Sequence, residues 1–314
     1  MVAETLLILG AAVALDFIVS DPPNRLHPTA WVGRLIGAIT PKLKGSSANV
    51  EKVKGTIFAV IVVSFITLST FYFLQLIEFF LGMAALVIAS IIMLKSTIAI
   101  RGMEVHARSV MDALANNDLA TARAKLANIV GRETSNLDEQ HILSATIESI
   151  GESTVDGITS PIFYYALFGI PGAFAYRTIN TLDSMIGYRD VYHRDIGWFS
   201  AHLDTIANYI PARVTALLMI PASKMVGADW KNSLYIMSRD KHNTPSLNGG
   251  WAMAAIAGAL RVRLEKIGYY SLGEAHEQLT LLHCIKAISI MKMTTILFCI
   301  AVALPAIILI SLVW

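Results

Sequence analysis

The amino-acid sequence predicts an all-α, polytopic integral membrane protein in which about four helices span the bilayer and further helices are re-entrant or buried. Hydrophobic residues make up 55% of the 314 residues and charged residues only 15%, and the mean hydropathy is +0.58. A soluble core of this size does not need so many apolar residues. Several stretches also reach the roughly 20 apolar residues that cross a hydrocarbon layer as a helix.

Four stretches are expected to span the membrane. They are residues 5–20, 56–77, 79–100 and 293–314. The second and fourth carry no charge, and the third carries only Lys95 near one end, where a long side chain can reach the interface. Glu78 is expected to mark a tight turn between the second and third. The first is shorter and contains Asp16, and it lacks the basic leader of a cleaved signal peptide.

Two more apolar stretches, 158–175 and 214–222, are short or interrupted by prolines. The basic segments 21–54 and 101–132 flank the same helical hairpin, so both are expected on the cytoplasmic side. The segment 176–208 is also basic, and it would lie outside if both apolar stretches crossed. We therefore expect them to be re-entrant or buried, below a cytoplasm-facing active site in a multi-pass protein of the plasma membrane.

No linker or repeat divides the chain, which predicts a single membrane-embedded domain over 1–314 with polar catalytic segments at 101–157, 176–213 and 238–270. The basic residues are scattered and not gathered into a stripe, so nucleic acid is not an expected partner. The two cysteines are expected to be reduced and packed.

The first polar cluster lies on a helix predicted over 138–157. His141, Glu148, Glu152 and Asp156 fall on one face of that helix. Stacked carboxylates repel one another unless a cation lies among them or the face is hydrated, and both interpretations remain open. The helix runs directly into an apolar segment, where unpaired carboxylates are costly, and this favours a functional role.

The second cluster, in the segment 176–190, places Arg177, Asn180 and Ser184 on one helical face with Asp183 at its edge. Arg, Asn and Ser donors suit phosphate oxygens, and an adjacent Asp suits Mg²⁺ that bridges those phosphates. A polar helix cap is the plainer alternative.

The third cluster repeats this chemistry, with Asp204 one turn before Asn208 and with Arg213 further on. Ser246 and Asn248 then precede a glycine pair and an Ala-rich helix, where a ligand can approach the backbone at a helix N-terminus that favours anions. An ordinary N-terminal cap is equally compatible with that turn. The chain has no Walker-type phosphate loop, HExxH pair or GxSxG elbow.

Several strings in the chain resemble those of one known family. They are DPPNRLHP at 21–28, IVGRETSNL at 129–137, the stretch 148–189, GWFSAHLDTIANYIPAR at 197–213 and SLNGGWAMAAIAGAL at 246–260. In this order they resemble the adenosylcobinamide-phosphate synthases of cobalamin biosynthesis. The resemblance covers roughly residues 14–270, and its NTLDSMIGY and ANYIPAR strings are the most specific.

The resemblance implies an acid–amine ligase that uses ATP and Mg²⁺. It would join the propionate carboxyl of adenosylcobyric acid to the amine of aminopropanol phosphate or ethanolamine phosphate, and the product would be adenosylcobinamide phosphate. A carboxylate must be activated before it forms an amide, most simply as an acyl phosphate with release of ADP. Phosphoryl transfer of this kind depends mainly on neutralising charge.

The expected residues come from the polar clusters. The expected catalytic residues are Asp183, Asp156 and Glu148; the expected Mg²⁺ ligands are Glu152, Asp156, Asp183 and Asp204; the expected ATP and phosphate contacts are Arg132, Arg177, Asn180, Ser184, Asn208 and Arg213; and the expected corrinoid contacts are His27, Ser246 and Asn248. A carboxylate among them would take the ammonium proton before attack. The other expected partners are the amino alcohol phosphate and the lipid bilayer, and association with further copies or with other cobalamin-assembly enzymes stays open.

The chain departs from the family pattern in three places. Residues 151–153 read GES where relatives read AEN, and residues 201–205 read AHLDT where relatives read ARLDD. Leu247 stands in place of the proline of the usual SPN string. One carboxylate and one guanidinium are thereby lost. The departures leave room for a non-catalytic regulatory protein of the same superfamily. A membrane phosphotransferase is a further alternative, although this chain lacks the paired DG motifs of that class. A transporter fits least, because the charged residues lie between the spans, apart from Asp16 and Lys95.

Overall fold

A computed structural model of the protein describes residues 2–23, 25 and 27–313. About 76% of the chain is helical, as predicted, and the chain forms two compact units that are each built from separate segments. One unit contains Met1–Ile98, Ser160–Asn208 and Ala303–Trp314, and the other contains Ala99–Thr159 and Tyr209–Val302. Because the chain passes between the units several times, no linker separates them in the sequence.

The first unit contains six helices among the residues that the structure describes. They are α1 (Val2–Ile18), α2 (Pro28–Leu43), α3 (Ala48–Lys95), α7 (Ser160–Ile186), α8 (Trp198–Ala207) and α13 (Leu304–Val313). Helix α2 begins at a proline, whose fixed backbone angle suits a first turn, and α3 begins after Ser47, whose Oγ accepts from Val50 N. The core of this unit lies between α2, α3 and α7, with Ile36, Val62 and Leu182 at its centre.

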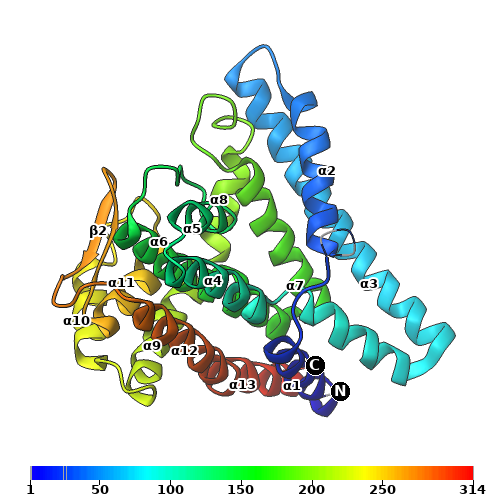
Figure 1. Cartoon of the computed structure of the whole chain (residues 1–314). Coiled ribbons are helices and arrows are strands. Elements are labelled where there is room, and N and C mark those ends of the chain that lie inside the picture. Colours follow the sequence, from blue (N-terminus) through cyan, green and yellow to red (C-terminus); the bar gives the residue numbers. More distant parts are fainter. Residues whose placement is uncertain (1, 24, 26, 314) are drawn as a thin grey trace. The chain divides into compact units, whose positions relative to one another are not determined.

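Helix α3 runs for 48 residues and contains the whole expected span 56–77 and residues 79–95 of the expected span 79–100. The chain changes direction within it at Gly82, whose φ of 80° and ψ of 178° break the helix (Figure 1). The turn that we expected at Glu78 therefore lies four residues later. Glycine adopts a positive φ without a steric penalty, whereas glutamate does not, which explains the position of the break.

Three helical runs among the described residues are long and apolar enough to cross a membrane. They are Ala48–Ala115, Glu139–Ile186 and Leu281–Leu312. The first contains two of the expected spans and the third contains residues 293–312 of another, whereas α1, at 17 residues, is not among them. The stretch 158–175, which we expected to be re-entrant or buried, lies within the second run. The expected count of four spans is thus only partly matched.

The second unit contains the remaining helices and a hairpin. They are α4 (Ile100–Ala115), α5 (Leu119–Leu126), α6 (Glu139–Ser153), the π-helix η1 (Thr154–Thr159), α9 (Tyr209–Met225), α10 (Trp230–Asp240), α11 (Gly249–Leu260), β1 (Arg263–Lys266), β2 (Tyr270–Gly273), α12 (Leu281–Phe298) and the π-helix η2 (Cys299–Ala303). Helix α11 is buried along most of its length, and α6, α9, α10 and α12 pack around it.

Small residues permit this close packing. A Cβ atom at Gly258 of α11 would lie 2.5 Å from Asn232 O of α10, so these two helices can approach only with glycine at that position. The antiparallel pair β1–β2 turns at Gly268, which has a φ of 76°, and pairs Arg263 with Gly273. The hairpin departs from the predicted all-α class. Helix α11 ends at Leu260, where Arg261 adopts a left-handed φ of 58°, and the chain then reverses at Gly268 within the segment 238–270 that we expected to be polar and catalytic.

Candidate functional site

Asp204 is the centre of a polar cluster in the first unit. It lies in the last turn of α8, and its Oδ2 accepts from Asn208 Nδ2 at 3.1 Å. Its Oδ1 accepts from Asn180 Nδ2, on α7, at 3.4 Å. Burial raises the pKa of Asp204, while the bonds from the Asn208 and Asn180 side chains oppose that rise. The carboxyl group is therefore held by two neutral amides and has a stronger tendency to bind a proton than an exposed Asp.

The same cluster extends from Asn208 and Asn180 to other side chains of α7. Asn208 is buried, and its Oδ1 accepts from Ser160 Oγ at 2.7 Å and from Tyr176 Oη at 2.8 Å. Asn180 Oδ1 accepts from Arg177 Nη1 at 3.3 Å. The second and third motifs of the sequence thus meet in one hydrogen-bonded group. Ser160 and Tyr176 were not expected to belong to it, because nothing in their spacing points to Asn208.

Asp183 and Ser184 lie one turn further along α7. Ser184 is exposed, and its Oγ donates to the backbone oxygen of Asn180 at 2.8 Å. Asp183 is partly buried, and a Cβ atom at Gly187 would lie only 1.9 Å from its Oδ1. The carboxylate of Asp183 therefore occupies the space that a side chain at Gly187 would fill, and glycine is required there.

His27 lies near a second group of charges in the first unit. Lys95 Nζ lies 2.6 Å from Asp21 Oδ1 and 3.2 Å from Asp16 Oδ1, and Lys95 and Asp16 are buried. His27 Nε2 is 3.9 Å from the same Asp21 oxygen. Burial lowers the pKa of His27, Asp21 opposes this, and Arg177 and Lys95 lower it further. The charges that we noted inside apolar stretches, at Asp16 and Lys95, thus form an ion pair, as charges in apolar helices usually do.

Glu148 is the centre of a polar cluster in the second unit. Its Oε2 accepts from Tyr270 Oη at 2.7 Å and from Arg132 Nη2 at 3.2 Å, and its Oε1 accepts from Ser144 Oγ at 2.8 Å. Burial raises the pKa of Tyr270, and the negative charges of Glu148 and Glu152 add to the effect. The arrangement makes Glu148 an acceptor that fixes Arg132 and Tyr270 in place.

The four residues expected on one face of 138–157 do not share one environment. Glu148 is buried, whereas Glu152 is exposed. Asp156 lies in the π-helix η1, where the wider turn shifts it away from α-helical spacing. His141 Nδ1 is 2.6 Å from Asp138 Oδ1, at the start of α6. The predicted α-helical face therefore ends before Asp156, because the chain is α-helical through Ser153 and π-helical from Thr154.

Arg213 lies between two aromatic rings in the second unit. Its guanidinium carbon is 3.4 Å from the centroid of the Tyr209 ring and 4.9 Å from that of Trp251. Its Nη1 donates to Asn248 Oδ1 at 3.1 Å, and Ser246 Oγ accepts from the backbone N–H groups of Asn248 and Gly249. Stacking and this bond fix the guanidinium at the start of α11. Ser246, by contrast, acts as a turn-forming acceptor, which was the plainer interpretation.

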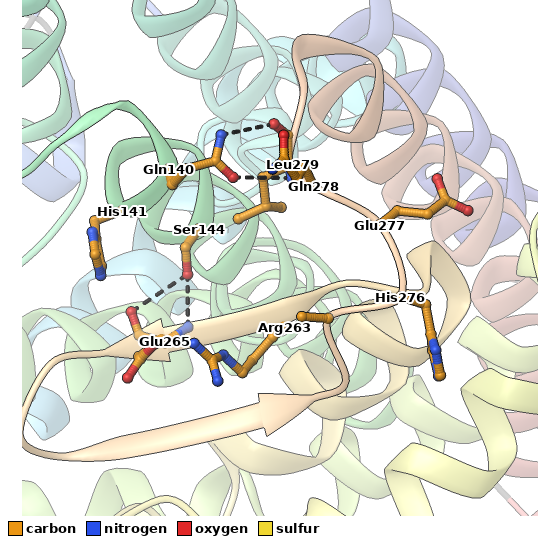
Figure 2. Close-up of a pocket in the computed structure, with 10 residues that line it drawn as sticks. Gln140, His141, Ser144, Arg263, Glu265, His276, Glu277, Gln278 and Leu279 are labelled. Carbon is orange, nitrogen blue, oxygen red and sulfur yellow. Dashed lines mark hydrogen bonds and ion pairs between the residues drawn. The ribbon is translucent and has the colours of Figure 1, made fainter.

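A cavity of about 330 Å³ opens beside α6 in the second unit (Figure 2). It is lined by Gln140, His141, Ser144, Arg263, Glu265, Ala275, His276, Glu277, Gln278 and Leu279. The Gln140 side chain and the Leu279 backbone bond to each other twice, and Ser144 Oγ accepts from Glu265 N at 2.8 Å, so the walls are fixed. Its volume is at the lower end for small-molecule sites. Sequence reasoning missed this cavity because the hairpin forms one wall.

The expected Mg²⁺ ligands fall into two sets, Asp183 with Asp204 in the first unit and Glu152 with Asp156 in the second. No group of three or more His, Cys, Asp or Glu residues able to hold a metal ion occurs within 2–23, 25 and 27–313. A resident metal cage is therefore not part of the described structure.

A family model described as "CobD/Cbib protein" matches residues 9–300. A probable cobalamin biosynthesis protein CobD of Methanothermobacter thermautotrophicus is 42% identical over 296 residues, which is 94% of this chain and 96% of the relative. Proteins named cobalamin biosynthesis protein CobD from Leptospira interrogans and Dehalococcoides mccartyi are 39% and 36% identical, over 84% and 86% of this chain and 83% and 87% of theirs. No solved structure matches. The chain belongs to the CobD/Cbib protein family, and its role is in cobalamin biosynthesis.

Proposed function

We propose that the protein is an ATP- and Mg²⁺-dependent ligase that joins adenosylcobyric acid to aminopropanol phosphate or ethanolamine phosphate. The carboxylate oxygen of the corrinoid attacks the γ-phosphorus of ATP, and ADP leaves. The amine nitrogen then attacks the acyl carbon, the C–O bond to phosphate breaks, and inorganic phosphate leaves as the amide forms. The amine enters as an ammonium ion, so a base must take a proton before the attack.

The observation that carries this proposal is the hydrogen-bonded group around Asp204. Its carboxyl group is held by the amides of Asn208 and Asn180 and has a raised pKa because it is buried. A carboxylate of raised pKa is a stronger base and suits removal of the ammonium proton. Arg177, bonded to Asn180 in the same group, supplies the positive charge that phosphate oxygens require.

We assign Mg²⁺ to the nucleotide, with one or two carboxylates of this chain completing its shell. Mg²⁺ commonly binds proteins in this way, through substrate phosphates, water and few carboxylates. The oxygen donors of the chain fit that pattern, whereas the lack of a three-ligand group among the described residues does not fit a cage made by the protein alone. Asp183 is our first choice of ligand, followed by Glu152 and Asp156. When bound, the ion would neutralise charge on the transferred phosphoryl group.

The remaining sites complete the proposal. Arg213, fixed between Tyr209 and Trp251, and Arg132, fixed by Glu148, are rigid guanidinium groups suited to phosphates. His27 and Asn248 stay our proposed corrinoid contacts, together with Ser246. We further propose that the protein lies in the plasma membrane with these polar segments on the cytoplasmic side, where ATP is supplied.

The departures from the family pattern favour one second candidate, a non-catalytic regulatory protein. Two of them, His202 and Thr205, lie on α8 beside Asp204. His202 is exposed, its ring lies 4.5 Å from that of Trp198, and its Nδ1 is 2.7 Å from Trp198 O. The His202 side chain thus contacts Trp198 of its own helix. The hydrogen bonds of Asp204 to Asn208 and Asn180 persist beside the changed residues, which supports retained catalysis.

Product analysis separates the two candidates. Purified protein with ATP, Mg²⁺, adenosylcobyric acid and aminopropanol phosphate should give the amide and an equal amount of ADP, both detected by mass spectrometry. Asp204→Asn keeps the size of the side chain and should remove most of the turnover, whereas Asp190→Asn, at an exposed carboxylate, is the matched control. Absence of product with either amino alcohol phosphate would favour the regulatory candidate.

A further inference from the structure

Three cations surround one buried carboxylate in the second unit, apart from the sites described above. Glu104 of α4 is buried, its Oε1 accepts from Arg108 Nε at 3.0 Å, and its Oε2 accepts from Arg101 Nη1 at 2.9 Å. Lys292, on α12, places its Nζ 2.7 Å from the same Oε2. We call these four residues the Glu104 cluster. Arg108 and Lys292 alone already bring two positive charges to the one negative charge of Glu104, so these three residues carry a net positive charge.

The carboxylate does not need so many cations. Arg108 alone lies within hydrogen-bonding distance of Oε1 through two nitrogens, at 3.0 and 2.9 Å. The cations also remain at the surface, since Arg108 is 49% exposed and Lys292 partly exposed, while Glu104 is buried. Like charges repel, and the buried carboxylate holds these cationic ends together at one place. A fixed group of surface cations is prepared to bind a second anion.

The sequence places this group at the edge of the apolar layer. Arg101 directly follows the apolar stretch that ends at Ile100, and Lys292 directly precedes the uncharged stretch 293–314. These are the positions at which a spanning helix meets the headgroup region of a bilayer. Basic residues at this level attract anionic lipid headgroups.

An exposed apolar stretch continues from Lys292 along α12 and into the π-helix η2. Ile296 lies on α12 and is 41% exposed, and Ile300 lies in η2 and is 60% exposed. Ile296 lies on the same side of α12 as Lys292, because side chains four residues apart share one side of an α-helix, and Ile300 follows about one turn later. A molecule that places an anion at Lys292 can therefore lay an apolar chain over these two residues. This combination is the chemistry of a phospholipid.

We propose that the Glu104 cluster is a binding site for the phosphate group of an anionic membrane phospholipid, whose acyl chain lies along Ile296 and Ile300. A soluble phosphate ester shares the headgroup chemistry, but it has no acyl chain that could cover Ile296 and Ile300. The proposal is independent of the ligase activity proposed above, because none of its residues belongs to the candidate site.

The test measures lipid affinity in the full-length protein in detergent micelles. Phosphatidylglycerol or phosphatidylcholine is titrated, and bound lipid is counted by native mass spectrometry. The double variant Arg108→Gln/Lys292→Gln is compared with Arg261→Gln/Lys286→Gln, which loses the same charge. Arg261 is 48% exposed, which matches Arg108, and Lys286 is an exposed lysine on α12.

We expect the first double variant to bind phosphatidylglycerol about 25-fold more weakly, since each cation near an anionic lipid contributes on the order of fivefold in affinity. The control should change far less, and phosphatidylcholine binding should be similar in all proteins. Equal weakening in both double variants would overturn the proposal, because it would show a diffuse charge effect. If the double variant does not fold, the single variant Lys292→Gln leaves both arginines on Glu104 and should still lose about fivefold.

A competition arm distinguishes the two sources of phosphate. Inorganic phosphate and ATP should displace phosphatidylglycerol from the wild-type protein only weakly. If the double variant Arg108→Gln/Lys292→Gln lost affinity for ATP but kept full affinity for phosphatidylglycerol, the assignment to a lipid would be overturned. Substitution of Ile300 by Asn should weaken phosphatidylglycerol binding without changing phosphate binding. An unchanged lipid affinity would show that the acyl chain does not lie along Ile300.

Discussion

Replacement of Asn208 by alanine should destabilise the protein more than any other single change in the cluster around Asp204. The buried amide accepts from Ser160 and Tyr176 and donates to Asp204. Alanine would remove all three of these bonds and leave their partners without that contact in a buried region. Each buried polar group that loses its partner costs roughly 1–3 kcal/mol, so with three such groups we expect a loss of about 3–9 kcal/mol in the free energy of unfolding.

The matched variant is Tyr176→Phe, which removes a single hydroxyl and leaves Asn208 bonded to Ser160 and Asp204. A single hydrogen bond contributes about 1 kcal/mol, so this variant should be only slightly less stable than the wild type. Equilibrium unfolding of the purified protein in mixed micelles, followed by circular dichroism, measures both differences. If Asn208→Ala were no more destabilised than Tyr176→Phe, the hydrogen-bonded group would not be held together as we describe.

Three further predictions concern charge and close packing. Burial raises the pKa of Asp204, so the folded state binds this proton more tightly than the unfolded state does. The group therefore favours folding below the unfolded pKa of about 3.9, and this contribution is lost as the pH rises through the folded pKa. Asp204→Asn should remove this part of the pH dependence in unfolding titrations, and an unchanged pH profile would contradict the prediction. Lys95→Met removes the buried ion pair of Lys95 with Asp16 and should cost about 3–5 kcal/mol. The double variant with Asp16→Leu should recover part of that loss in the same unfolding assay, because Asp21 still lacks Lys95, and no recovery would argue against a direct pair of Lys95 with Asp16. Gly187→Ala would place a Cβ atom 1.9 Å from Asp183 Oδ1 and should lower turnover, measured at a temperature at which the variant is still folded. A fully active alanine variant would show that the position of this carboxylate does not matter.

Local features of the sequence predicted much of the fold. The apolar stretches 56–77 and 79–100 predicted a helical hairpin, and α3 has its break within a few residues of the expected place. The polar motifs singled out Asn180 as an expected phosphate contact and Asp204 as an expected Mg²⁺ ligand, and the structure joins the two residues by a hydrogen bond between α7 and α8 that the sequence did not predict. The helices and the polar motifs depend on residue type and on spacing within one segment, which a single sequence displays directly.

Contacts between distant segments were beyond such reasoning. The bond from Tyr176 to Asn208 joins residues 32 positions apart, and the pair of Lys95 with Asp16 joins two helices whose register no local pattern sets. The π-helix η1 could not be seen either, because its letters also fit an α-helix, and it displaced Asp156 from the expected face. The hairpin near Gly268 was missed because two strands of four residues carry little periodic signal.

The central claim, that the protein activates a corrinoid carboxylate by phosphoryl transfer, is tested most directly by oxygen labelling. Adenosylcobyric acid labelled with ¹⁸O in the reacting carboxyl group is incubated with the protein, ATP, Mg²⁺ and aminopropanol phosphate, and the inorganic phosphate is analysed by mass spectrometry. The proposed acyl phosphate transfers one labelled oxygen to phosphate for each amide formed. Formation of the amide with unlabelled phosphate, or with the label in AMP, would contradict this account.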